Sequence, residues 1–493
     1  AGAEHGSKGA EHGSKGAEHG SKGAEHGSKG GRPQADYFGL ARAFCDGHRD
    51  ANGVLTLRYW RDCWYEHDGS CYRMRSDADL ESEMMGFLQT GKAVEYNCQP
   101  GVNAMRNAIA NLKSKTMCYL PSHREPPFFI DSGEPATGWT VFKNCLLNVE
   151  LAAAMAGERL NGEPPDDMEQ AECRRDNSAN IFTPFALPYD YDPTATCPTF
   201  DRYLTDVQPD PATREMMLML MGLALVPDTR YNVCFFVYGE PGTGKSKFMD
   251  ILQLLVGAEN CCSIGLLSLE DKFVTWELTE KLLNLVGDLP TSDPQGRMRY
   301  VEGMFKDVVS GGYIDVQRKG KDVVHAKAFA RHIFATNELP TFFDRSGAIW
   351  DRLRILPFNI VFRGTNREDT SLNDKLAREM PGIFNRAIRA LDALRRAQTF
   401  PESPLSATLK REQQDHCDID AVFLRENYER RDGCQVSSSD AYKHYREWLA
   451  ENGYSPRTSG TFKQHVQRVF RVRETRENHS TRVFDNLARI ATI

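Results

Sequence analysis

Gly239-Glu240-Pro241-Gly242-Thr243-Gly244-Lys245-Ser246 is the stretch that decides the fold, because it carries the complete pattern of a phosphate-binding loop. A continuous apolar run at residues 233–238 precedes it and predicts a buried parallel strand. Apolar residues at helical spacing follow it at residues 248–256. The glycines of such a loop let backbone N–H groups turn inward around a triphosphate, and the start of the helix adds its positive dipole end. The sequence therefore predicts a strand, a loop and a helix that bind a nucleoside triphosphate, ATP.

Polar side chains with suitable chemistry lie in this loop and at the ends of two further apolar runs. We expect Lys245 to reach the outer phosphates and the Ser246 hydroxyl to bind Mg²⁺. The run at residues 282–288 ends in Asp288, a second oxygen ligand for the metal. The run at residues 332–337 ends in Asn337, whose amide can contact the γ-phosphate or orient the attacking water.

A fourth apolar run, residues 353–358, has Arg352 at its entrance. Because parallel sheets bind ligands at the carboxyl ends of their strands, we expect Asp288, Asn337 and Arg352 to project together from that edge or its adjoining loops. Many P-loop ATPases have a second acid beside this one, but Asp288 is flanked by Gly287 and Leu289. The sequence therefore does not identify the residue that polarises the attacking water. Glu240 and Glu338 are the candidates for that role.

Length and composition indicate an ordinary folded protein of several domains. At 493 residues the chain is too long for one core. It has neither an apolar run of membrane-spanning length nor a signal-peptide pattern at its start, so we expect a cytoplasmic protein without a membrane partner. The 13 cysteines follow no repeating pattern, which favours buried free thiols. With a formal net charge of −7, any nucleic-acid contact must be locally basic.

Changes in pattern divide the chain into five regions. Residues 1–33 contain repeats of Ala-Glu-His-Gly-Ser-Lys-Gly without a large apolar residue, which predicts a disordered linker. Residues 34–150 are mixed α and β, with strand-like runs at 55–60 and 63–65 and a hairpin turn at 67–70. Residues 151–230 are loop and helix, ending in an apolar helix at 215–226. Residues 231–400 form the nucleotide-binding core. Residues 405–493 are the last region, and within it residues from about 418 to 493 are predicted to be helix, helix, helix and a basic hairpin with strands at 471–473 and 482–484.

A second hairpin is predicted at residues 311–323, between the second and third strands of the core. Two β-prone runs there flank a Lys-Gly-Lys tip, and the neighbouring cations are Arg318, Lys319 and Lys321. Such point charges can bind the phosphates of a polynucleotide independently of its base sequence. The alternative is a solvated basic turn.

Jointly, the order of these motifs resembles the superfamily 3 helicases, AAA+-like ATPases, and specifically the helicase part of phage and plasmid primases. The resemblance covers most of residues 37–493. Its motifs are the phosphate loop, the Asp288 strand, Phe305-Lys306, Gly311-Gly312, residues 335–340, Asp344-Arg345-Ser346, residues 349–358, and residues 187–193 before a helical collar.

The resemblance implies an α/β fold: a P-loop AAA+-like ATPase core with a parallel sheet, preceded by an α+β domain and a helical collar and followed by a winged helix. It implies a ring, usually a homo-hexamer, that hydrolyses ATP between subunits. In it Asn337 is the sensor and Arg352 the arginine finger, with Arg345 and Arg354 as competing candidates. The hairpin at 311–323 lines a central pore and the winged helix contacts DNA.

The implied activity is that of an ATP-dependent replicative DNA helicase of a phage, plasmid or mobile element, and the implied location is a bacterial host cell or nucleoid. It translocates 3′ to 5′ on single-stranded DNA, acts on forked DNA, and works with a primase or polymerase domain upstream or in trans. The alternative is an ATP-switched, DNA-binding replication initiator or loader without processive unwinding. Within this chain we favour no zinc site for Cys45, His48, Cys63, His67 and Cys71, and no primase site at Asp190 and Asp192, which prolines flank.

Overall fold

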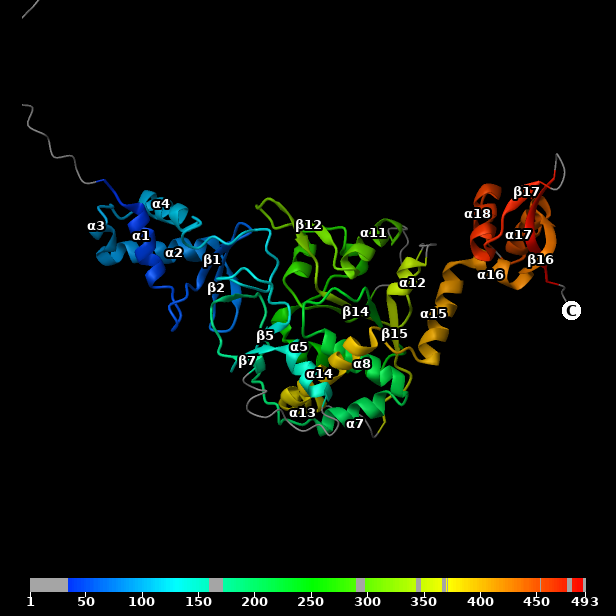
Figure 1. The fold of residues 1–493 in the computed structure, drawn as a ribbon, viewed down its shortest axis with the longest axis horizontal. Helices are drawn as coiled ribbons and strands as arrows, with labels where there is room; N and C mark the ends of the chain where they lie inside the picture. Colours follow the sequence, from blue (N-terminus) through cyan, green and yellow to red (C-terminus); the bar gives the residue numbers. More distant parts are fainter. Residues whose placement is uncertain are drawn as a thin grey trace, which may run out of the picture.

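The computed structural model describes residues 34–158, 172–289, 298–342, 347–365, 369, 371–452, 454–476 and 481–490. The predicted linker at 1–33 and the motif Asp344-Arg345-Ser346 lie outside the described residues. Figure 1 shows an elongated chain, with the N-terminal part at one end, a central part around a sheet, and α15 leading to the C-terminal part. Within the described ranges, no helix combines the length and the apolar character needed to span a bilayer.

A five-stranded parallel sheet organises the central part. Its strand order is β10-β11-β14-β9-β15, and each neighbouring pair is parallel. The strands are β9 (Cys234–Tyr238), β10 (Cys261–Cys262), β11 (Leu283–Val286), β14 (Arg331–Thr336) and β15 (Leu353–Pro357). Every residue of β14 is buried, as expected for a central strand of a parallel sheet. The predicted mixed α/β core with a parallel sheet is thus confirmed.

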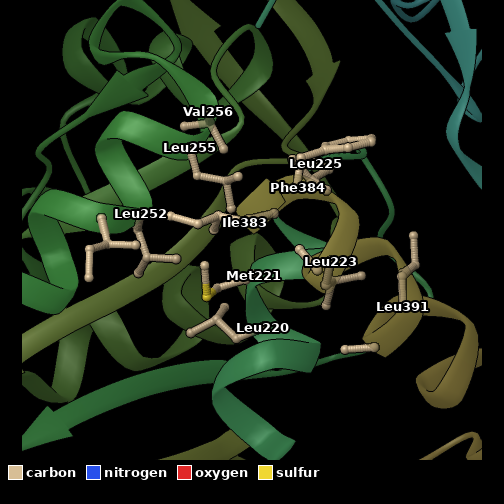
Figure 2. Close-up of a cluster of buried hydrophobic side chains, with 14 of the residues drawn as sticks. Leu220, Met221, Leu223, Leu225, Leu252, Leu255, Val256, Ile383, Phe384 and Leu391 are labelled. Atoms are coloured by element: carbon tan, nitrogen blue, oxygen red, sulfur yellow. The ribbon is translucent and has the colours of Figure 1, made fainter. Parts of the chain in front are cut away.

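Alternate side chains of the strands enter two separate apolar cores. Phe235 and Val237 of β9 point into the larger core, together with α8 (Pro211–Leu223), α9 (Lys245–Val256) and α14 (Met380–Ala397). Cys234 and Phe236 point the other way, toward α11 (Met298–Val309) and α12 (Ala348–Arg352). Figure 2 shows α8, α9 and α14 side chains meeting in the larger core. Because both faces are covered, the sheet offers ligands only its edges.

The helices α8 and α14 approach each other unusually closely. Asp210 caps α8, since its side chain accepts a hydrogen bond from the Thr213 backbone N–H at 2.7 Å, and the helix ends at Leu223, before the predicted end at 226. At Gly222 an added Cβ would overlap the carbonyl oxygen of Ala387 and lie 2.9 Å from the Leu391 Cβ. Glycine is therefore required there by the neighbouring backbone.

The N-terminal part joins a small sheet to several helices. It contains α1 (Tyr37–Asp46), β1 (Leu57–Trp60), β2 (Cys63–His67), β3 (Tyr72–Arg75), α2 (Asp77–Phe87), a π-helical turn (Leu88–Lys92), α3 (Ala93–Glu95) and α4 (Val102–Leu112). The predicted turn at 67–70 joins β2 to β3, and Asp68 accepts hydrogen bonds there from the Ser70 and Cys71 backbone at 2.8 and 2.9 Å. The first strand begins at Leu57 rather than at 55.

Short elements connect this part to the core. They are β4 (Phe128–Phe129), β5 (Trp139–Val141), β6 (Leu146–Asn148), α5 (Val149–Glu158), β7 (Arg174–Arg175), β8 (Ile181–Phe182) and α7 (Pro198–Val207). Three 3₁₀ turns (Ala258–Asn260, Leu266–Ser268, Trp276–Thr279), α10 (Lys272–Thr275) and α13 (Leu372–Arg378) complete the central part.

The C-terminal part differs from the predicted order of three helices and a hairpin. It contains α15 (Pro404–Cys417), α16 (Ile419–Asn427), β16 (Tyr428–Ser437), α17 (Ser438–Glu451), α18 (Ser459–Phe470), β17 (Glu474–Arg476) and β18 (Arg482–Arg489). The strand β16 is an addition, and it pairs with β18 in a sheet of order β16-β18-β17. The predicted hairpin is formed, but its first strand begins three residues later because Arg471 adopts φ +53° after α18.

We expect Gly222→Ala to lower the free energy of unfolding by roughly 1–3 kcal/mol, because the new methyl group must displace helix backbone. Calorimetric unfolding measures this change. Gly303→Ala in α11 is the matched control, since an added Cβ there has nothing within 4 Å and removes only glycine's helix penalty. Equal stability of the two variants would contradict the close contact of α8 with α14.

Candidate functional site

The phosphate-binding pattern forms the turn between β9 and α9. Gly239, Gly242 and Gly244 have φ values of +155°, +84° and +94°, which residues with side chains rarely adopt. The Thr243 hydroxyl donates a hydrogen bond to the Glu240 carbonyl oxygen at 2.8 Å and fixes the middle of the loop. Lys245 is the first residue of α9, so the loop ends at a helix N-terminus.

Lys245 connects this loop to the neighbouring strand. Its ammonium group donates to the carbonyl oxygens of Gly239 and Glu240 at 2.5 and 2.9 Å and to Oδ1 of Asn337 at 2.8 Å. Partial burial lowers the pKa of Lys245, while the nearby carboxylates of Glu240 and Asp288 oppose that shift. The structure therefore brings together Lys245, Asp288 and Asn337, which come from three separate segments.

These residues line a cavity of about 810 Å³ at the carboxyl edge of the sheet. Ser246 and Asp288 are in its wall. The chain leaving β11 at Asp288 is fixed to β14, because the Leu289 N–H donates a hydrogen bond to the Ala335 carbonyl oxygen at 3.0 Å. A volume of this size is typical of pockets for small organic ligands. The hydroxyl and carboxylate oxygens of Ser246 and Asp288 are ligand types that Mg²⁺ prefers, so this donor set fits the predicted metal.

The far wall of the cavity contains residues that the sequence motifs did not indicate. It is formed by α7, α13 and the segment after β15, with the lining residues Thr199, Arg202, Tyr203, Asp206, Val207, Phe362, Arg363, Asp369, Leu372 and Lys375. They come from positions more than thirty residues before and a hundred residues after the loop, and no local pattern marks them. Among the cavity residues of the described chain, neither Glu240 nor Glu338 is present.

Arg352 does not lie at this edge, and our expectation that it would was wrong. It precedes β15, which is parallel to β9 and pairs Leu353 with Cys234 and Pro357 with Tyr238. Arg352 is therefore at the amino edge, about 17 Å of strand away from the phosphate loop. Its guanidinium donates to the Ser310 hydroxyl at 3.0 and 3.2 Å and to the Ala348 carbonyl oxygen at 2.7 Å. Of the competing arginines, Arg354 binds the backbone carbonyls of Asp351 and Leu353 at 2.8 and 2.9 Å, and Arg345 is outside the described residues.

The predicted hairpin between the second and third core strands is confirmed. Its strands β12 (Tyr313–Gln317) and β13 (Val323–Lys327) pair antiparallel, with Gln317 opposite Val323 next to the tip. Ile314 and Val316 are buried in the second apolar core, which anchors one face of the hairpin.

The three cations near the tip are in different environments. Arg318 is 16% exposed, and its guanidinium donates to the Tyr65 hydroxyl at 3.0 Å and to Glu280 at 2.5 Å and lies 4.1 Å from the Trp276 ring. Lys321 donates to Asp77 at 2.9 Å, and this bond raises the pKa of Lys321. Lys319 is exposed and has no ion pair within the described part of the chain. Arg318 is thus committed to internal contacts with Tyr65 of the N-terminal part and with Glu280 and Trp276 of the central part. Lys319 is the cation that faces solvent.

Asp192 of the pair Asp190 and Asp192 precedes a turn, where its side chain accepts hydrogen bonds from the Thr194 N–H and hydroxyl at 2.9 and 2.6 Å. All 13 thiols are free, and Cys45, Cys63 and Cys71 are buried. In the described ranges the only group of three or more His, Cys, Asp or Glu side chains close enough to share a metal ion is Asp418, Asp420 and His465. Its two acids pair with Arg468 and Arg457.

Comparison with known proteins gives a family without an assigned function and relatives with helicase names. "Family of unknown function (DUF5906)" matches residues 237–352. "Putative helicase L207/L206" of Acanthamoeba polyphaga mimivirus is 24% identical over 272 residues, which are 51% of this chain and 28% of that protein. "Putative helicase 121R" of Invertebrate iridescent virus 3 is 23% identical over 278 residues, 50% of this chain and 29% of that protein. The chain thus spans less than a third of these relatives.

Solved structures share the fold over nearly the whole chain. The A form apo structure of the NrS-1 C-terminal region and a second apo structure of that region superpose with TM-scores of 0.50 and 0.51. Both alignments cover 92% of this chain and 100% of the other, at 12% and 11% identity. At this identity the likeness concerns the fold alone.

We expect Glu280→Ala to destabilise the protein by roughly 3–5 kcal/mol, because it leaves the Arg318 guanidinium buried without its carboxylate. Denaturant unfolding measures the loss. Glu95→Ala, which breaks the exposed pair of Glu95 with Lys92, is the control and should cost under about 1 kcal/mol. A loss from Glu280→Ala as small as that of the control would mean that Arg318 is solvated.

Proposed function

We propose that this chain is the ATPase part of an ATP-dependent DNA helicase, with ATP and Mg²⁺ bound in the cavity at the carboxyl edge of the sheet. The observation that carries the proposal is the Lys245–Asn337 bond of 2.8 Å, which joins a complete phosphate-binding loop to the polar end of the adjacent strand. The helicase names of the viral relatives support the assignment from an independent direction.

Each cavity residue has a role in this proposal. Lys245 exchanges its carbonyl and amide acceptors for phosphate oxygens when the nucleotide binds, and Asn337 is then free to contact the γ-phosphate or the attacking water. Ser246 and Asp288 hold Mg²⁺, which neutralises charge on the phosphate oxygens. Partial burial lowers the pKa of Lys245 from its ordinary value, and electrostatic contacts in such a partly desolvated site are stronger than in water.

Arg352 acts in the proposal on the nucleotide of a neighbouring subunit. Its position at the amino edge excludes a contact with the phosphate loop of its own chain. A ring of identical subunits, a hexamer in the superfamily 3 helicases that the motifs resemble, brings the amino edge of one sheet to the nucleotide of the next. The planar fork of arginine then neutralises charge on the transferring phosphoryl oxygens.

DNA contacts are assigned to the hairpin β12–β13 and to the C-terminal part. Lys319 and Lys321 at the hairpin tip supply charges for the phosphates of single-stranded DNA, and Arg318 holds the hairpin against the N-terminal part. The order α16, β16, α17, α18, β17, β18 matches a winged helix, which we assign to duplex DNA at the fork. Residues 151–230 form the collar, and translocation is 3′ to 5′. The origin in a phage, plasmid or mobile element and the primase partner belong to the same proposal.

We expect Lys245→Ala to abolish ATP hydrolysis and strand displacement on a forked DNA duplex. The Lys247→Ala variant is the matched control, because Lys247 lies two residues along α9 and binds Asn373 at 3.1 Å instead. Wild-type protein that hydrolyses ATP and binds the fork without displacing a strand would favour the initiator or loader alternative. Unchanged hydrolysis in Lys245→Ala would contradict the proposed site.

We expect Lys319→Ala to weaken binding of single-stranded DNA more than Lys321→Ala does, since Lys321 first has to leave Asp77. Removing one phosphate contact should reduce the slope of log K against log salt by about 0.7. Fluorescence anisotropy with labelled single-stranded DNA at several salt concentrations measures both quantities. Basal ATP hydrolysis should stay unchanged in both variants. DNA affinity unchanged in both would remove the hairpin from the DNA path.

A further inference from the structure

The segment that follows β15 runs in backbone contact with the phosphate loop. The Phe358 N–H donates to the Tyr238 carbonyl oxygen at 2.7 Å, and the Phe362 N–H donates to the Gly242 carbonyl oxygen at 2.9 Å. An added Cβ at Gly239 would overlap the carbonyl oxygen of Phe358. Gly239 is thus required by this crossing segment as well as by the curvature of the loop.

Arg363 lies directly across the loop at this crossing. Its Cβ, Nε and Cδ would be 2.7, 3.6 and 3.7 Å from a Cβ placed on Gly242, so the side chain follows the surface of that glycine. Its backbone N–H also points at the Gly242 carbonyl oxygen, at 3.3 Å. Arg363 lines the same cavity as Lys245 and Ser246.

The side chain of Arg363 has no charged partner among the described residues, whereas two other cations of the cavity wall have polar or charged partners. Lys247 binds Asn373 at 3.1 Å and lies 3.8 Å from Asp250, and Lys375 pairs with Asp369 at 2.6 Å. Arg363 is exposed and makes no side-chain hydrogen bond or ion pair with any described residue. Arg202 on α7 is in the same situation, but no contact joins it to the phosphate loop.

We propose that Arg363 is a phosphate-binding residue that contacts the nucleotide of its own subunit. The inference rests on the proposed ATP site and adds to it a cation that no motif marks. A guanidinium beside Gly242 can donate two parallel hydrogen bonds to phosphate oxygens, a geometry that a lysine cannot supply. Arg352 and Arg363, at opposite ends of β15, then serve two different nucleotides: Arg363 that of its own chain and Arg352 that of a neighbour.

The test is equilibrium binding of MgATP and of inorganic tripolyphosphate to the full chain carrying Arg363→Gln. Glutamine keeps the aliphatic stem on Gly242 and removes the charge. We expect both ligands to bind about tenfold or more weakly, as for the loss of a charge-assisted hydrogen bond. Arg363→Lys should recover part of the affinity. The thermal midpoint without ligand should equal that of the wild type.

A control variant loses the same charge far from the cavity. Arg106→Gln on the exposed face of α4 should bind both ligands normally. Normal affinity in Arg363→Gln would overturn the inference while leaving the ATP site intact. A loss for MgATP without a loss for tripolyphosphate would also overturn it, because phosphate would not be the group contacted. A wild-type protein that binds neither ligand would overturn the proposed function itself.

Discussion

The parallel pairing of β9 with β14 and β15 is the constraint on which the rest of this structure depends. Parallel pairing sends the carboxyl ends of all strands to one edge, so residues far apart in sequence meet there without a dedicated scaffold. Lys245 and Asn337 come within 2.8 Å for this reason. Both faces of the sheet are covered by apolar cores, which leaves that edge as the place for a ligand. The same pairing forces Arg352, at the start of β15, to the opposite edge.

Much of the core could be predicted from local sequence, because a buried parallel strand, a glycine-rich turn and an amphipathic helix each leave a pattern within about ten residues. The phosphate loop, the strands ending near Asp288 and Asn337, and the hairpin β12–β13 are of this kind. The strand β16 was missed because half of its ten residues are exposed and it contains four consecutive charged residues, and because its pairing with β18 depends on residues more than forty positions away. The cavity wall from α7 and from the segment after β15 was missed for the same reason: only the tertiary fold brings Tyr203 and Arg363 to the loop.

Contacts with the N-terminal part occupy two cations that the sequence alone predicts to be free for DNA. Arg318 reads as a basic tip residue, yet Tyr65, Glu280 and Trp276 enclose it, and Asp77 binds Lys321. The hairpin is therefore connected to the N-terminal part by charged contacts at its tip. In the proposed motor, a movement of the hairpin along DNA has to break the bond between Lys321 and Asp77 or carry the N-terminal part with it. Because Glu280 belongs to the central part, either course also has to separate Arg318 from its carboxylate, and a buried guanidinium without its partner is strongly destabilising.

The central claim is that each nucleotide lies between two subunits, with Lys245 from one chain and Arg352 from the next. The most direct measurement is ATP hydrolysis by mixtures of Arg352→Ala and Lys245→Ala protein, each inactive alone. Mixed assemblies contain some interfaces with an intact Lys245 opposite an intact Arg352, so the account predicts turnover that rises and falls with the mixing ratio. No turnover at any ratio, under conditions where subunits exchange, would contradict it.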